Sequence, residues 1–170
     1  MSDARSERAD GYPGLPEYAG GAYFDSATDR QAEDAAFKVQ HFLRLFGPVA
    51  AERRWRVRSY ADVGCGSGVE VRAVLDVLRG AGHPVAEAWG YDIHPGVELI
   101  ASGADVNFVR GDFTKSVNRV DLVTLFDVFE HVPDPVGFLR SVADRCRYLG
   151  FHIPLDNCLN HSLRDRYHSK

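Results

Sequence analysis

A glycine-rich turn follows the first strand that the sequence predicts. The stretch from Ser59 to Gly68 reads SYADVGCGSG, a short apolar run that breaks into G-x-G-x-G. Glycines let backbone N–H groups approach a ligand that a Cβ would push away. The helix that follows offers unpaired N–H groups and the positive end of its dipole. We expect this turn to bind a ligand at the carboxyl end of a strand.

The turn differs from two common phosphate-binding motifs. A dinucleotide fingerprint, G-x-G-x-x-G, would need its third glycine at Val69, and a phosphate loop would need Gly-Lys-Ser or Gly-Lys-Thr, which the sequence lacks. Asp62 gives the turn an acidic approach, which suits a cationic or amino-bearing ligand better than a pyrophosphate. An NAD-dependent oxidoreductase is therefore disfavoured.

Acidic residues also follow three other predicted strands, at Asp92, Asp112 and Asp127. The carboxyl ends of parallel strands meet at one edge of a sheet, so these side chains are expected to converge on the glycine turn. A carboxylate at Asp92 can accept both hydroxyls of a ribose. Asp112 can accept from an exocyclic amino group, with the apolar face of Phe113 beside a base. Each aspartate alone is more often a turn or cap residue, but the ordered set predicts a nucleotide-like ligand.

The elements that position these residues alternate between helix and strand. Strands are predicted from Ser59 to the glycine turn and at 86–91, 107–110, 121–126 and 148–153. A helix is predicted before the first strand, from Asp29 to Phe46, and Gly47-Pro48 is expected to end it. A second helix follows the glycine turn, with a buried stripe of Val71, Val74, Leu75 and Leu78. Two more helices are predicted to begin at His94-Pro95, with Ala104 on the buried face, and at Asp134-Pro135. The alternation predicts an α/β fold with a doubly wound, mainly parallel sheet of about five strands.

Length and composition indicate one domain. At 170 residues the chain is expected to form a mobile N-terminal arm over 1–21, rich in Gly, Pro and Ser, and a single domain over 22–170. Aromatic residues of the arm either pack it onto the body or close over a ligand. The basic stretch Arg53 to Arg58 is interpreted as a solvated approach to the first strand, with phosphate contact as the alternative.

Charge and cysteine content exclude several classes of partner. The net charge of −4 gives no general attraction to nucleic acid or to an anionic membrane. Cys65, Cys146 and Cys158 have no C-x-x-C spacing, which favours a reducing compartment. Neither a membrane-spanning run nor an apolar signal region is present in the sequence. We therefore expect a cytoplasmic protein without nucleic-acid or membrane partners.

Taken together, the motifs resemble the class I S-adenosylmethionine-dependent methyltransferases. The likeness rests on D-V-G-C-G-S-G from Asp62, on Asp92, on Gly111-Asp112-Phe113 and on FDVFEHVPDP from Phe126 to Pro135. The last segment contains the D-x-x-E-H-x-x-D-P pattern of small-molecule methyltransferases, and the likeness covers roughly residues 58 to 154. It implies a Rossmann-like fold, S-adenosyl-L-methionine as cofactor, S-adenosylhomocysteine as product and a small-molecule acceptor.

The resemblance also implies a role for individual residues. It places the glycine turn around the methionine part of the cofactor and the later strand ends around its ribose and adenine. The implied cofactor-binding residues are Asp62 at the amino group; Gly64, Cys65, Gly66 and Gly68 in the turn; Asp92 at the ribose; Ile93, Asp112 and Phe113 at the adenine; Phe126 and Asp127 near the sulfonium; and Tyr23 closing the pocket.

The implied reaction is in-line displacement of a methyl group from a sulfonium, in which alignment supplies most of the rate effect. A hydroxyl acceptor would need a base. His131 is the first candidate, because imidazole changes charge near neutral pH; the alternative is that it fixes the loop. Asp127, Glu130 and His131 can also be read as magnesium ligands, but a capping carboxylate and a packed histidine are favoured, so no metal is expected.

The C-terminal part departs from the family pattern. Full-length members usually add an antiparallel hairpin after the fifth strand, whereas this chain ends about sixteen residues beyond Pro154. A fragment or natural truncation is favoured over a helical tail or a partner chain that covers the strand. The exposed edge of the fifth strand is then expected to pair with a second copy as a homodimer. The alternative function is a catalytically inactive cofactor-binding or regulatory module of the same fold.

Overall fold

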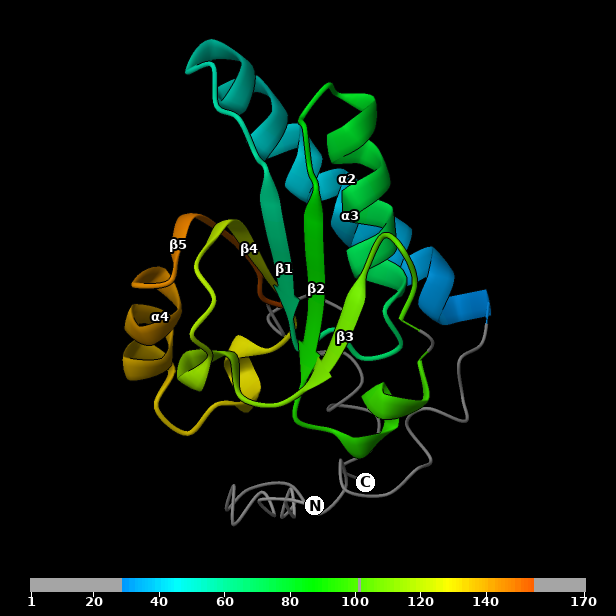
Figure 1. The fold of residues 1–170 in the computed structure, drawn as a ribbon, viewed down its shortest axis with the longest axis vertical. Helices are drawn as coiled ribbons and strands as arrows, with labels where there is room; N and C mark the ends of the chain where they lie inside the picture. The colour runs from blue at the N-terminus through cyan, green and yellow to red at the C-terminus, as the bar shows by residue number, and fades with distance from the viewer. Residues whose placement is uncertain (1–28, 101, 155–170) are drawn as a thin grey trace, which may run out of the picture.

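A parallel sheet organises the part of the chain that the structure describes. The structure is a computed structural model that describes residues 29–100 and 102–154 (Figure 1). Its sheet has the order β3-β2-β1-β4-β5, and each neighbouring pair is parallel. The strands are β1 Ser59–Val63, β2 Glu87–Asp92, β3 Asn107–Arg110, β4 Val120–Phe126 and β5 Cys146–His152. The predicted α/β fold with about five parallel strands is confirmed.

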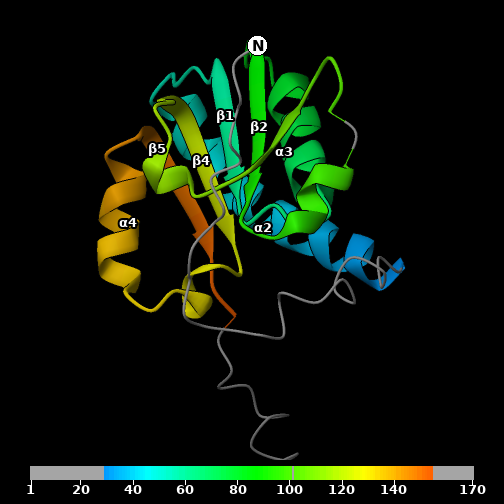
Figure 2. The same ribbon diagram turned by 60° about the horizontal axis from the view of Figure 1, so that its bottom comes forward.

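Helices cover both faces of this sheet. Helices α2 (Asp29–Glu52) and α3 (Val69–Gly80) lie on one face and α4 (Pro135–Ala143) on the other, as Figures 1 and 2 show. In the described ranges, the connections contain the short 3₁₀ helices η2 (Pro95–Leu99), η3 (Phe113–Lys115) and η4 (Phe129–His131). The sheet is therefore doubly wound, as predicted.

Alternation along the strands divides the core between the two faces. Tyr60 of β1 and Leu122 of β4 pack with α2 and α3, while their sequence neighbours Ala61 and Val123 pack on the side of α4. Successive strand side chains point to opposite faces, so one central strand supplies both cores. The predicted stripe of α3 is buried as expected: Val71, Val74, Leu75 and Leu78.

Helix α2 continues past the residues that were expected to stop it. The prediction of an end at Gly47-Pro48 is wrong, because the helix runs to Glu52 with Pro48 inside it. Proline removes one backbone donor and usually breaks a helix. Here Ala50 lies four residues after Phe46 and is only 3% exposed, so the buried stripe of the helix continues beyond the proline. Tertiary packing thus outweighs the local signal.

The helix predicted after His94-Pro95 is shorter than expected. Pro95 takes the first position, but η2 ends at Leu99, and Ile100 already has an extended backbone. Val97 is fully buried, whereas Ala104, expected on the buried face, is exposed. One buried anchor is therefore enough to hold this connection without a full amphipathic helix.

Strand β5 has β4 as its neighbour on one side and, among the described residues, no strand on the other. The homodimer through this edge stays a prediction. The arm over residues 1–21, Tyr23, Cys158 and the segment after Pro154 lie outside the described residues. No helix in the described ranges is long and apolar enough to cross a membrane.

Candidate functional site

The glycine turn is fixed against two neighbouring segments at the carboxyl end of β1. The N–H groups of Gly64 and Cys65 donate to the carbonyl oxygen of Tyr91 in β2, at 2.8 and 3.0 Å. Gly64 and Gly68 have φ values of +79° and +78°, which favour glycine. A Cβ at Gly64 would also overlap Val128, and one at Gly68 would overlap the Phe108 ring. The glycines therefore allow both the backbone shape and the close packing of the turn.

Asp92 ties this turn to the end of β2. Its Oδ2 accepts a hydrogen bond from the N–H of Gly66 at 2.9 Å, and its Oδ1 accepts one from the N–H of His94 at 2.7 Å. The carboxylate is therefore held in place before any ligand binds. Each oxygen has a second lone pair that a ligand hydroxyl can reach. This arrangement fits a ribose diol.

Asp62 belongs to a buried chain of hydrogen bonds beneath the turn. The hydroxyl of Thr124 donates to Asp62 Oδ1 at 2.5 Å, and the Tyr60 hydroxyl lies 2.7 Å from the Thr124 oxygen. Asp62 is 1% exposed. Burial, together with the nearby Glu70 and Asp92 carboxylates, raises the pKa of Asp62 well above its usual value, although Thr124 opposes the shift.

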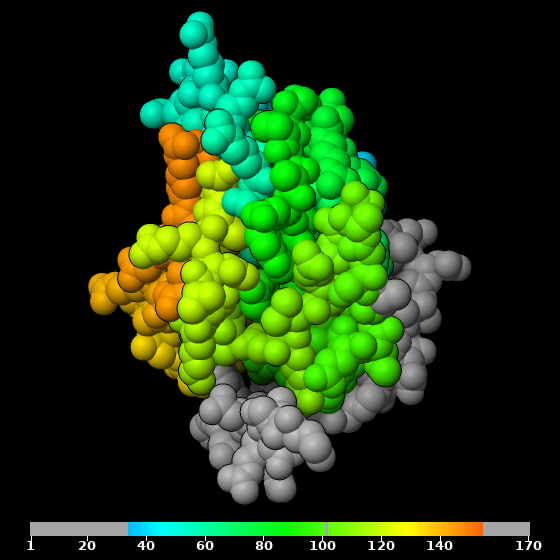
Figure 3. All heavy atoms as spheres, in the orientation of Figure 1, coloured from blue at the N-terminus to red at the C-terminus, as the bar shows by residue number. Residues whose placement is uncertain are grey.

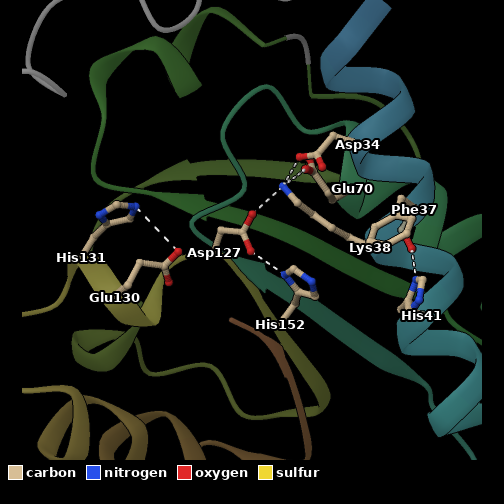
Figure 4. A network of polar contacts seen from close by, with 9 residues as sticks. All are labelled: Asp34, Phe37, Lys38, His41, Glu70, Asp127, Glu130, His131 and His152. Atoms are coloured by element: carbon tan, nitrogen blue, oxygen red, sulfur yellow. Dashed lines mark hydrogen bonds and ion pairs between the residues drawn. The ribbon is translucent and has the colours of Figure 1, made fainter. Parts of the chain in front are cut away.

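A lysine that the sequence analysis did not assign reaches this edge from α2. Figure 4 shows the Lys38 ammonium between the carboxylates of Asp34, Glu70 and Asp127, at 2.6, 3.8 and 2.7 Å. The Lys38 side chain is 11% exposed. Burial opposes its charge, but the hydrogen bonds to Asp127 and Asp34 outweigh burial and raise the pKa of Lys38. Helices α2 and α3 and the end of β4 are thus joined by one cation.

Asp127 connects that cation to the end of β5. Its Oδ1 lies 2.5 Å from Nδ1 of His152, and its N–H donates to the His152 carbonyl oxygen at 3.1 Å. The residue has a φ of +54°, a left-handed conformation that Asp tolerates better than most side chains. Burial opposes ionisation, but the hydrogen bonds from Lys38 and His152 lower the pKa of Asp127.

Carboxyl groups therefore gather at the carboxyl edge of the sheet. Burial raises the pKa of Asp62 and of Glu70 and so favours their neutral forms, whereas the pKa of Asp127 is lowered and its carboxylate stays charged. Lys38 pairs with Asp34 and Asp127. Such an edge favours a ligand with cationic groups and disfavours a bare phosphate.

Other predicted cofactor-binding residues are packed in the core. Cys65 and Phe113 are each 1% exposed, and Phe126 is 7% exposed. Phe113 packs edge-on against Tyr91, and Phe126 packs edge-on against Phe42 of α2. Burial also raises the pKa of the Cys65 thiol. Their side chains hold the strand ends in position, and a direct cofactor contact by them stays a prediction.

The remaining predicted residues lie nearer the surface. Ile93 is 54% exposed, next to Asp92, which suits an apolar contact with a ligand. Asp112 caps η3 by accepting from the N–H and the hydroxyl of Thr114, at 2.9 and 2.6 Å. Figure 4 shows His131 with Glu130, apart from the Lys38 cluster; His131 Nε2 lies 4.0 Å from Glu130 Oε1.

Residues that could hold a metal are not grouped in the described ranges. Among these residues, no set of three or more His, Cys, Asp or Glu side chains is arranged to hold an ion. The expectation that the site uses no metal stays a prediction.

Three residues of the site were missed in the sequence: Lys38, Glu70 and His152. Lys38 is one of only three lysines in an arginine-rich chain, and that rarity was a usable signal. His152 stands at the end of a predicted strand, the position that drew attention to the aspartates. Glu70 follows the glycine turn in the first turn of α3 and had no separate signal.

The chain is similar to known methyltransferases. Residues 30–169 match the family described as Methyltransferase domain. The chain is also 29% identical over 123 residues to the ubiquinone biosynthesis O-methyltransferase of Azotobacter vinelandii, a match that covers 66% of this chain and 50% of that protein. The chain thus spans about half the length of the curated relative that it matches.

Solved structures share the fold at low sequence identity. The plantazolicin methyltransferase BpumL, in complex with a pentazolic desmethylPZN analog and S-adenosylhomocysteine, has a TM-score of 0.51 and 17% identity; the likeness covers 74% of this chain and 52% of that one. An S-adenosylmethionine-dependent methyltransferase from Clostridium acetobutylicum has a TM-score of 0.50 and 13% identity, with 74% and 50% covered. Both likenesses concern the fold alone.

We expect Asp62→Asn to stabilise the protein at neutral pH. The raised pKa of Asp62 means that the folded state keeps a proton which the unfolded chain loses near pH 4, about its ordinary value. Above that pH the folded state binds more protons than the unfolded state does. The free energy of unfolding therefore falls as the pH rises. Asparagine still accepts from Thr124 and has no proton to lose. Urea unfolding from roughly pH 5 to 8 should show a flatter dependence in the variant.

Asp121→Asn is the matched control for this measurement. Asp121 also accepts a backbone hydrogen bond, from the N–H of Arg58 at 2.7 Å, but it lies at the other end of the sheet. Parallel stability curves for the wild type and Asp62→Asn would contradict the assignment of the pH dependence to Asp62.

Proposed function

Because the chain belongs to the Methyltransferase domain family, we propose that its glycine-turn edge binds S-adenosyl-L-methionine and that the protein transfers the methyl group to a small-molecule acceptor. The cofactor predicted from the sequence is the one that this family uses, and S-adenosylhomocysteine is present in a structural neighbour with the same fold. What we propose for this chain itself is that it transfers the methyl group and that the acceptor is a small molecule.

The acidic edge of the sheet is the observation that carries this proposal. S-adenosylmethionine has a sulfonium and an α-ammonium group, and both are cations. Glu70 and Asp127 are held around the place where the glycine turn meets the end of β4, and the pKa of Asp127 is lowered, which keeps its carboxylate charged. A ligand with a pyrophosphate would be repelled there, whereas the sulfonium and α-ammonium groups would replace lost solvation with nearby carboxylates.

The ribose and adenine would lie along the end of β2. The preoriented carboxylate of Asp92 would accept the ribose hydroxyls, since its oxygens are already positioned by Gly66 and His94. Exposed Ile93 would pack on the adenine. Asp112 would reach the base only through lone pairs that Thr114 leaves open.

Lys38 would bind the carboxylate of the methionine part. Its ammonium group has three N–H donors, and two of them are used by Asp34 and Asp127 at hydrogen-bond distance. The third carboxylate, that of Glu70, lies 3.8 Å away, beyond a good hydrogen bond. The α-ammonium of the ligand would then meet the acidic side chains while its carboxylate meets Lys38.

Bound S-adenosylmethionine supplies a methyl group on a positively charged sulfur. The chain would contribute alignment of the acceptor with that methyl group, which can supply a large part of the rate effect. For a hydroxyl acceptor, His131 would take the proton, because it lies on the connection after β4 and is exposed to an incoming molecule. His152, oriented by Asp127 through Nδ1, is the second candidate.

We expect Asp92→Asn to weaken binding of S-adenosylhomocysteine at least about tenfold, because a charge-assisted bond to the ribose is lost. Isothermal titration of the whole chain measures this affinity. Asp121→Asn makes the same chemical change at the opposite end of the sheet and should alter the affinity by less than about twofold.

Two outcomes of this titration separate the candidate functions. If the wild-type protein gives no heat of binding with S-adenosylhomocysteine, the methyltransferase proposal is wrong. Wild-type protein that binds it but transfers no labelled methyl group to a panel of phenols, amines and sugars would identify the inactive cofactor-binding module instead.

A second prediction concerns Lys38. Lys38→Met should weaken S-adenosylhomocysteine at least about tenfold more than it weakens 5′-methylthioadenosine, because the latter has no carboxylate for Lys38 to bind. Lys38→Arg should retain most of the affinity. Equal losses for both ligands would show that Lys38 only holds the site together.

The proton acceptor is tested by the turnover of two histidine variants. With a hydroxyl acceptor, His131→Gln should lower kcat by about 10²–10⁴ and leave the affinity for S-adenosylhomocysteine unchanged. His152→Gln is the comparison variant. A loss of kcat in His152→Gln alone would transfer the role to His152.

A further inference from the structure

A second polar site lies at the opposite end of the sheet from the glycine turn. The connection between α2 and β1, residues Arg53 to Arg58, meets the starts of β4 and β5 around a cavity of about 250 Å³. Five arginines and one carboxylate line it, with two aromatic rings: Arg53, Arg54, Arg56, Arg58, Arg147 and Asp121, beside Trp55 and Tyr148. Figure 3 shows the α2–β1 connection (cyan) next to the beginning of β5 (orange).

Within the described residues, the arginines of this cavity outnumber the carboxylates, because Asp121 is the one acidic residue in its lining. Among the described residues, none of the five guanidinium groups lies within ion-pair distance of a carboxylate. Asp121 accepts from the backbone N–H of Arg58 at 2.7 Å, so one of its oxygens serves to join β1 to β4. Arg56 Nη1 donates to the carbonyl oxygen of Gly82 at 3.3 Å.

Helix α2 explains only part of this clustering. Arg53 and Arg54 follow its C-terminal residue Glu52, where a cation is favoured by the helix dipole. Arg58 comes directly before β1, and Arg147 is the second residue of β5. These two arginines come from distant parts of the sequence and meet at one cavity.

An aromatic pair gives the cavity a firm wall. The rings of Trp55 and Tyr148 stack with their centroids 4.0 Å apart, and the Arg147 guanidinium lies 5.2 Å from the centre of the Tyr148 ring. Tyr148 is 9% exposed, and its hydroxyl has no hydrogen-bond partner among the described residues. A ligand oxygen would satisfy this buried donor.

We propose that this arginine cavity binds a diphosphate group. Guanidinium groups present paired N–H donors that match the oxygens of phosphate, and several around one cavity suit a ligand with more than one negative charge. The cavity lies below the usual range of about 300–1,000 Å³ for drug-sized ligands, which favours a compact anion. A nucleic acid would need an extended basic surface, and the chain carries a net charge of −4.

Titration of the full chain with inorganic pyrophosphate tests the proposal. The donor site is first saturated with S-adenosylhomocysteine, and EDTA removes divalent cations. We expect saturable binding that weakens at least about tenfold in the double variant Arg58→Gln, Arg147→Gln. Arg110→Gln, Arg140→Gln removes the same charge from exposed arginines at the end of β3 and on α4, and should change the affinity by less than about twofold. Circular dichroism checks that each variant is folded.

Further titrations identify the source of the group. Equal affinities for ADP and pyrophosphate would assign the site to the free diphosphate, and tighter ADP binding would assign it to a nucleotide; either result supports the proposal if the Arg58 and Arg147 dependence remains. The absence of pyrophosphate binding, or equal losses in both double variants, would overturn it. Binding of an oligoribonucleotide without binding of pyrophosphate would also overturn it.

Discussion

The carboxyl edge of the sheet depends on the balance between one lysine and the carboxylates around it. Asp127 would be unfavourable in its half-buried position without a partner, and Lys38 supplies that partner at 2.7 Å. The same ammonium holds Asp34 of α2 and lies near Glu70 of α3. Its removal would therefore affect the docking of both helices and the end of β4. The packing of these helices on the sheet does not by itself require a lysine and three acidic side chains at this edge.

The two ends of the sheet have opposite electrostatic character. Carboxyl groups gather where the parallel strands end, and arginines gather where β1 and β5 begin. A net charge of −4 hides this separation, because whole-chain composition averages over positions that the fold keeps apart. Topology produces the separation: parallel strands place all their carboxyl ends at one edge, so residues distant in sequence share one field. The acidic edge fits a cationic cofactor, and the basic end fits an anion.

Local sequence patterns predicted the strands and the glycine turn but not the contacts between distant elements. The strand from Asn107 to Arg110 was predicted with the bounds it has, since its apolar run is short and ends at a glycine. Helix α2 was cut at Pro48 because proline usually ends a helix, while the burial of Ala50, which continues it, is a tertiary property. Lys38 was overlooked for the same reason. Its partners Glu70 and Asp127 are far away in sequence and meet it only after folding.

Residues at the site serve the fold and the proposed ligand at once. Asp92 positions the turn through Gly66, so the bond that stabilises the apo protein also preorients an acceptor for a ribose. Asp62, in contrast, makes the folded protein less stable when it is charged. It is fully buried, and its raised pKa means that its charged form opposes folding. The hydrogen bond from Thr124, whose oxygen also lies 2.7 Å from the Tyr60 hydroxyl, partly offsets this cost and holds the carboxyl beneath the glycine turn.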